Sequence, residues 1–162
     1  MDLFAFNEDF FKGIPYKPEA FFIDRLLSAD SARRQIVCEV DTRKTFPLVE
    51  GQRHHELLHP PHLPGAIIIH LTGMVGLAAA WYFLGVRFDR GWSGYGSRIH
   101  RAEFKRLVRL GPALSLECGI TEVKSRGSRM IVRYSLRFSQ EGFLAYAGEQ
   151  TAFYRQYALP LE

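Results

Sequence analysis

The sequence is poor in cysteine and has no glycine-rich nucleotide-binding motif. Its 162 residues include two cysteines, Cys38 and Cys118, which stand in separate strand-like runs without CxxC spacing. Cysteines placed in this way favour buried free thiols in a reducing compartment over a disulfide. Because no glycine-rich phosphate loop is present, nothing in the sequence indicates nucleotide binding.

Internal repeats, low-complexity tracts and Gly/Ser linkers are also missing, so we expect residues 1–162 to form a single domain. The first 13 residues, MDLFAFNEDFFKG, carry acidic residues among phenylalanines and lack the basic start of a signal peptide. We therefore expect a cytoplasmic protein.

The formal net charge is +4, and the basic residues are scattered rather than blocked together. No nucleic-acid-binding motif accompanies them, so we expect no nucleic-acid partner. The densest basic stretch is either a solvated strand face or a patch that docks an acidic carrier protein or a phosphate-bearing group. This stretch spans residues 97–109 and contains Arg98, Arg101, Lys105, Arg106 and Arg109.

The hydrophobic pattern predicts an α+β domain with one long helix. Residues 65–86 are nearly as long as a membrane span, but His70 interrupts them and their Gly and Ala content suits close packing, so we expect a buried central helix. Strand-like runs precede and follow it, separated by turn signals such as Leu-Gly-Pro and Glu-Gly. We predict a curved antiparallel sheet of five or six strands around the helix. The runs cover residues 17–30, 33–41, 94–108, 113–125, 127–140 and 142–155.

Three segments carry a resemblance to a known family. AFFIDRLLSAD (20–30), LPGAIIIHLTG (63–73) and AEFKRLVRLGPAL (102–114) stand in the order and at the spacing of the hotdog fold. More narrowly, they resemble the β-hydroxyacyl-carrier-protein dehydratases of the FabA/FabZ type. The resemblance spans residues 18–155 and implies a hotdog sheet wrapped around the central helix.

The resemblance also implies chemistry. Dehydratases of this type remove the α-proton of a 3-hydroxyacyl thioester with a loop histidine, and an acid on the central helix handles the departing hydroxyl. A backbone N–H at the start of the helix polarises the thioester carbonyl. Because the histidine and the acid come from opposite subunits, a homodimer is implied, with a higher oligomer or a heterodimer as variants. The substrate is carried on the phosphopantetheine of a carrier protein or of coenzyme A, and no other cofactor is expected.

Carried onto this chain, the motifs match unevenly. Pro64 and Gly65 take the place of the family's Pro-Gly, so the Gly65 amide is the candidate oxyanion donor; unpaired N–H groups at a helix start suit that role independently. The acid's position holds His70. The family's loop motif G-H-F-P-G is absent, and its histidine falls on Glu56, next to His55. Either the carboxylate and the imidazole have exchanged places, or His55 is the base and no acid stands on the helix.

Histidine is concentrated in residues 53–70, RHHELLHPPHLPGAIIIH, which hold five of the six in the chain. His55–His59 matches the zinc motif H-E-x-x-H in letters, but that motif must lie inside a stable helix, and Pro60–Pro61 end any helix here. We therefore expect no metal. His70 is either a core histidine bonded to a backbone carbonyl or an acid–base group. We expect His54 and His62 to be solvated loop residues and His100 to be structural.

Three functions remain open. The first is a 3-hydroxyacyl-thioester dehydratase of fatty-acid or polyketide-type metabolism, the second is a thioesterase on the same fold, and the third is a degenerate acyl-binding or heterodimer subunit. The candidate catalytic residues are His55, Glu56, Gly65 and His70. The candidate substrate-binding residues are Pro64, Leu71, Met74 and Phe104 for the acyl group and Arg98, Lys105 and Arg106 for the phosphate or an acidic carrier.

Overall fold

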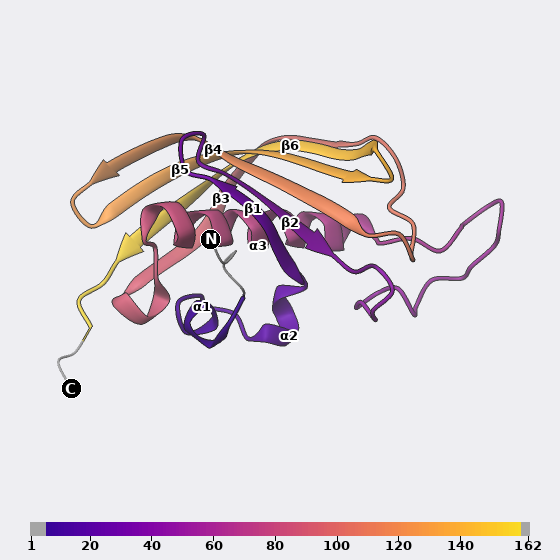
Figure 1. Ribbon diagram of the computed structural model, residues 1–162, viewed down its shortest axis with the longest axis horizontal. Helices are drawn as coiled ribbons and strands as arrows, with labels where there is room; N and C mark the ends of the chain where they lie inside the picture. Colours follow the sequence, from indigo (N-terminus) through magenta and orange to yellow (C-terminus); the bar gives the residue numbers. More distant parts are fainter. Residues whose placement is uncertain (1–5, 160–162) are drawn as a thin grey trace.

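The computed structural model describes residues 6–159 and shows one sheet curved over one long helix (Figure 1). The strands are all antiparallel, in the order β1-β2-β4-β5-β6-β3. This confirms the α+β prediction, including the number of strands. In chain order the elements are α1 (Glu8–Lys12), α2 (Pro18–Phe21), β1 (Arg25–Asp30), β2 (Gln35–Val40), α3 (Gly65–Leu84), the short 3-10 helix η1 (Phe88–Arg90), β3 (Trp92–Phe104), β4 (Leu114–Arg126), β5 (Arg129–Gln140) and β6 (Phe143–Gln156).

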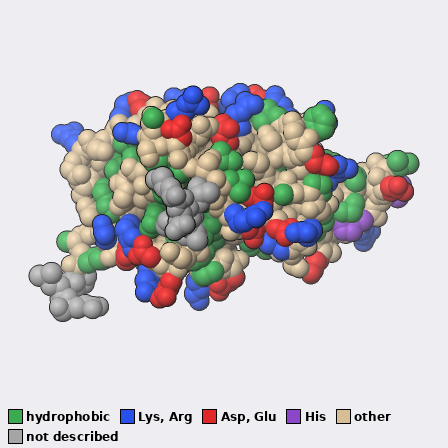
Figure 2. Space-filling view, in the orientation of Figure 1, with side chains coloured by type: hydrophobic (Ala, Val, Ile, Leu, Met, Phe, Trp, Pro, Cys, Tyr) green, Lys and Arg blue, Asp and Glu red, His purple; other side chains and the backbone are tan. Residues whose placement is uncertain are grey.

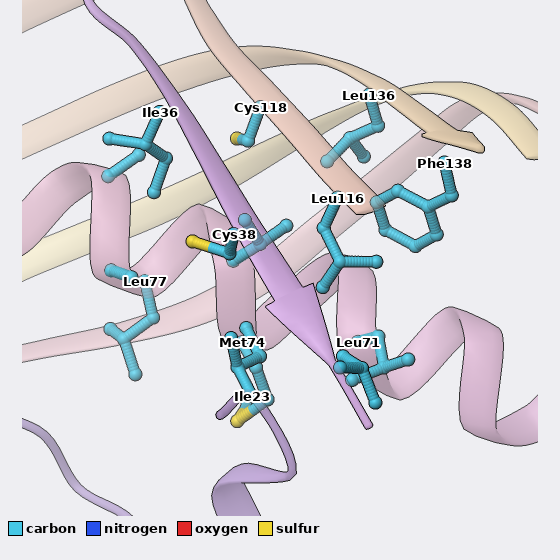
Figure 3. Packing of buried hydrophobic residues seen from close by; sticks show 14 of the residues in the cluster. Ile23, Ile36, Cys38, Leu71, Met74, Leu77, Leu116, Cys118, Leu136 and Phe138 are labelled. Atoms are coloured by element: carbon cyan, nitrogen blue, oxygen red, sulfur yellow. The ribbon is translucent and has the colours of Figure 1, made fainter. Parts of the chain in front are cut away.

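The core lies between the concave face of the sheet and α3. Alternate residues of β2, β4 and β5 point toward the helix, as the period of two along a strand requires. Figure 3 shows Leu116, Leu136 and Phe138 above Leu71 of the helix, all of them at most 1% exposed. Cys38 and Cys118 belong to the same layer, and both thiols are free.

Helix α3 is the core helix of the domain. Among the described residues it is the one segment long and apolar enough to cross a membrane, yet 61% of its apolar stretch is buried inside the protein. The helix begins directly after Pro64 and ends at Gly85, whose φ of 64° suits a residue without a Cβ atom. Gly85 therefore stops it two residues before the predicted end.

The N-terminal segment departs from the prediction of a strand over residues 17–30. Pro18 starts the short helix α2, and the left-handed Phe22 (φ 61°) ends it, so the strand begins only at Arg25. The physical reason is tertiary: Phe21 is 1% exposed in an aromatic cluster with Phe10, and this packing outweighs the local strand propensity.

This segment covers the side of α3 that faces away from the sheet (Figure 1). Phe10 packs edge-on against Trp81 of α3, with ring centroids 5.5 Å apart. Beyond the helix, the guanidinium of Arg87 forms ion pairs with both Asp9 and Asp89. Sheet and N-terminal segment thus enclose α3 from two sides.

Candidate functional site

The start of α3 has two backbone N–H groups without a partner among the described residues. Pro64 precedes the helix, no side chain caps it, and no acidic residue stands in its first turn. The Pro64 carbonyl accepts hydrogen bonds from Ile67 N (2.9 Å) and Ile68 N (3.2 Å), whereas Gly65 N and Ala66 N take part in no hydrogen bond of the described chain. Such a helix start carries partial positive charge and suits a negatively charged oxygen.

This helix start opens on a cavity of 450 Å³, which we call the α3-start cavity. The Phe104 ring borders it and lies 3.4 Å from where a Cβ atom at Gly65 would stand. Two cations also line it, because Lys105 N and Arg106 N both donate to Ala145 O and so hold the segment after β3 against β6. The complete lining is His62, Leu63, Gly65, Ile68, Phe104, Lys105, Arg106, Leu107, Val108, Ala145 and Tyr146.

The imidazole at this cavity belongs to His62, for which the sequence predicts only a solvated loop position. Its Nδ1 lies 2.7 Å from the Pro60 carbonyl oxygen. Since a carbonyl can only accept, Nδ1 carries the hydrogen, and Nε2 of the neutral ring keeps its lone pair. Gln52 Nε2 donates to the His62 carbonyl (3.0 Å), and Leu63 N donates to Val108 O (2.9 Å), so the backbone is anchored on both sides of the ring.

His55 and Glu56 lie away from this cavity, on the exposed loop between β2 and α3. The loop projects from the body of the protein (Figure 1), and Figure 2 shows histidine side chains gathered on it. His55 and His59 pair through their backbones at 2.9 Å, and His55 Nδ1 accepts hydrogen bonds from the amides of Leu57 and Leu58. The H-E-L-L-H string thus closes a tight turn, and within residues 6–159 no three potential ligands gather into a metal site.

His70 faces the N-terminal segment. Its Nε2 donates to the carbonyl of Ala20 at 2.7 Å, and the rings of Tyr16 and Phe22 pack on it edge-on. The structure thus shows a histidine bonded to a backbone carbonyl, and the role of His70 as an acid–base group stays a prediction.

A second cavity, of 360 Å³, lies beside the middle of α3; we call it the α3-middle cavity. Its helix residues Ile69, Thr72, Gly73 and Gly76 share a face with Gly65 at i+4, i+7, i+8 and i+11. Of the predicted lining residues, Met74 and Arg98 border this cavity and Phe104 borders the first, whereas Leu71 packs in the core. The other lining residues are Pro15, Tyr16, Leu77, Gly94, Tyr95, Gly96, Ser97, Ile99, Tyr134, Gln150, Thr151, Ala152 and Tyr154.

No family model matches the sequence. Among curated proteins, the 3-hydroxyacyl-[acyl-carrier-protein] dehydratase FabZ of Chlamydia abortus is 24% identical over 139 residues, which cover 83% of this chain and 85% of that protein. This likeness runs through most of both chains and agrees with the resemblance drawn from the three sequence segments.

Solved structures give the same fold at lower identity. The dehydratase heterocomplex ApeI:P from Xenorhabdus doucetiae aligns with a TM-score of 0.63 at 12% identity, covering 91% of this chain and 90% of that chain. A mutant thioesterase from Pseudomonas aeruginosa aligns with a TM-score of 0.58 at 15% identity, covering 86% and 85%. The protein therefore has the hotdog fold. Within that fold it resembles the FabZ-type dehydratases in sequence.

Proposed function

We propose that the protein acts on acyl thioesters, with the thioester carbonyl bound at the start of α3. The observation that carries the proposal is the pair of free amides, Gly65 N–H and Ala66 N–H, beside a cavity that His62 also borders. Preorganised N–H groups stabilise the negative charge that develops on a carbonyl oxygen during enolisation or hydrolysis. Dehydration and hydrolysis of an acyl thioester both pass through such an oxyanion.

The reaction that we propose first is dehydration of a 3-hydroxyacyl thioester, because the FabZ relative and the ApeI:P complex are both named as dehydratases. In this scheme His62 Nε2 takes the α-proton, the C–H electron pair becomes the C=C bond, and the hydroxyl leaves with a proton as water. The imidazolium of His62 can return its proton to that hydroxyl. Alternatively, the proton for the departing hydroxyl comes from His55 or Glu56, whose projecting loop reaches the cavity of a neighbouring subunit.

Thioester hydrolysis is the second candidate. It is favoured by the composition of the α3-start cavity, which among the described residues has one imidazole and no carboxylate. A base that activates water and an oxyanion site are sufficient for hydrolysis. A thioesterase also stands among the structural neighbours. The third candidate, a subunit that completes a heterodimer, is supported by the name of the neighbouring heterocomplex.

We assign the carrier end of the substrate to the cations of the cavity rim. Lys105 and Arg106 border the cavity that contains Gly65, and both are exposed. Arg106 lies over the Phe143 ring at 4.2 Å, which holds its guanidinium in place beside the cavity. A phosphopantetheine phosphate, or an acidic carrier protein that bears it, complements this charge, and no further cofactor enters the scheme.

We further propose that two copies pair through β3. It is an edge strand of 13 residues, and a long free edge is a template for pairing with another chain. Three large hydrophobic side chains on it are half or more exposed: Tyr95 (63%), Ile99 (50%) and Phe104 (55%). A homodimer formed here would lie next to both cavities, and size-exclusion chromatography with light scattering measures it directly.

The test is an assay of the purified protein with 3-hydroxyacyl, 2-enoyl and saturated acyl thioesters, followed by enoyl absorbance and by free thiol. Interconversion of the first two identifies a dehydratase, and thiol release identifies a thioesterase. We expect His62→Gln to lower kcat by a factor of about 10²–10⁴. His54→Gln, an exposed histidine on the same loop, is the matched control and should keep full activity. Equal activity of both variants would show that His62 is not the base.

A further inference from the structure

The α3-middle cavity continues along the helix face that begins at Gly65. Gly73 and Gly76 stand about 12 and 16 Å from Gly65 along the helix axis, at a rise of about 1.5 Å per residue. Both line the cavity, as do Gly94 and Gly96 of β3. A Cβ atom at Gly73 or Gly96 would meet nothing within 4 Å, so these positions border open space. The distal part of an acyl group bound at Gly65 and extended along this face would reach the cavity.

The lining of the cavity is mostly apolar but includes two tyrosines, Tyr134 and Tyr154. Tyr134 and Tyr154 are 1% and 3% exposed, and their hydroxyl oxygens lie 2.8 Å apart. Two hydroxyls carry two hydrogens, but only one hydrogen can lie between them. For the other, no acceptor is found among the described residues, and both rings line the cavity. A buried O–H that lacks an acceptor is costly, so this hydrogen is a site for an incoming oxygen.

The surrounding residues hold this pair of hydroxyls in place. A Cβ atom at Gly94 would stand 2.3 Å from the Tyr154 ring, so only glycine lets the ring lie against β3. Beside Tyr134, Gln150 Nε2 donates to Thr72 O (2.9 Å), and the one hydroxyl hydrogen of Thr72 is shared between Ile69 O (2.7 Å) and Gln150 Oε1 (2.9 Å). Burial raises the pKa of both tyrosines, so each hydroxyl remains a donor at neutral pH. The donor is therefore preorganised.

Building on the proposed function, we infer that the α3-middle cavity selects acyl groups whose distal end carries a hydrogen-bond-accepting oxygen, such as a hydroxyl, ketone or ether. The free hydroxyl hydrogen of the Tyr134–Tyr154 pair donates to that oxygen. A plain alkyl chain of the same length leaves this hydrogen without a partner. This one donor thus sets a preference at the far end of the substrate, separate from the chemistry at its thioester.

The probes are N-acetylcysteamine thioesters from hexanoyl to dodecanoyl, each compared with its analogue bearing a ketone next to the terminal methyl group. Binding is measured by isothermal titration calorimetry on the full chain, so the readout does not depend on turnover. At the matching length we expect the ketone to bind about five- to tenfold more tightly than the plain chain, the value of one net hydrogen bond. The double variant Tyr134→Phe/Tyr154→Phe should reduce this ratio to about one while binding plain chains as well as before.

Tyr157→Phe, which changes an exposed tyrosine outside the cavity, is the control and should keep the preference. If the double variant does not fold, each single variant is tested, and at least one must weaken the preference. Equal binding of ketone and plain chains at every length overturns this inference and leaves the proposed function intact. Failure of every thioester to bind overturns both.

Discussion

The two long faces of α3 differ in what they do for the protein. One face is filled with apolar side chains such as Leu71 and Val75, both 0% exposed. The face that starts at Gly65 carries Ile69, Thr72, Gly73 and Gly76 and borders two cavities. One face contributes close packing and the other leaves space, so stability and ligand binding are placed on neighbouring faces of a single helix.

The largest expected effect tests the packed face. Leu71→Ala should lower the free energy of unfolding by about 2–5 kcal/mol, because it removes buried methyl groups and leaves a void in the core. Ile69→Ala, on the helix face that borders the cavity, is the control and should cost roughly 1 kcal/mol. Urea denaturation measures both, and equal losses would show that the two faces are not distinct.

A smaller loss is expected from the polar contact between α3 and β6. Thr72→Val removes the hydroxyl that Ile69 O and Gln150 Oε1 share as donor and should cost about 1–3 kcal/mol. Thr121→Val, on an exposed strand position where the hydroxyl donates to Arg133 O, should change stability by less than about 0.5 kcal/mol. If the two substitutions lower the free energy of unfolding equally, the buried contact between Thr72 and Gln150 stabilises the protein no more than an exposed hydrogen bond does.

A gain in stability, rather than a loss, is expected for a substitution on the helix face that borders the cavities. Gly73→Ala should stabilise the protein by roughly 0.5–1 kcal/mol, since alanine favours the helix and its Cβ atom would meet nothing within 4 Å. Gly94→Ala should instead destabilise it, because the new Cβ atom would clash with the Tyr154 ring. Thermal melting compares the two variants, and a loss of stability in Gly73→Ala would mean that the space beside the helix is filled.

The smallest effect is expected for the reactivity of the two buried thiols, Cys38 and Cys118. Burial raises the pKa of Cys38 to about 12 and that of Cys118 well above its usual range, so neither should react with Ellman's reagent at about pH 8 until the chain unfolds. A Ser31→Cys variant, in an exposed turn, should react at once. The pKa of Cys38 is higher in the folded than in the unfolded protein. Burial of the neutral thiol therefore contributes its full stability below about pH 9, and this contribution declines as the pH rises toward 12.

The histidines show how far sequence reasoning extends. The Pro64–Gly65 start of the helix is predicted by the sequence, and the structure places it beside a cavity. His62 was missed as the imidazole at that cavity, although it stands three residues before Gly65. Its position depends on hydrogen bonds from Gln52 and to Val108, and such long-range contacts leave no periodic pattern in the sequence.

Local patterns in the sequence determined the central helix, the alternation of the strands and the glycine that ends α3, because each depends on neighbours within a few residues. Only the tertiary structure decided that residues 18–21 form a helix rather than a strand and that His70 bonds Ala20. It also brought Tyr134 and Tyr154 together through the pairing of β5 with β6. Strand register and loop closure join residues far apart in the chain, and the buried surface of the whole domain selects among the arrangements that local propensity allows.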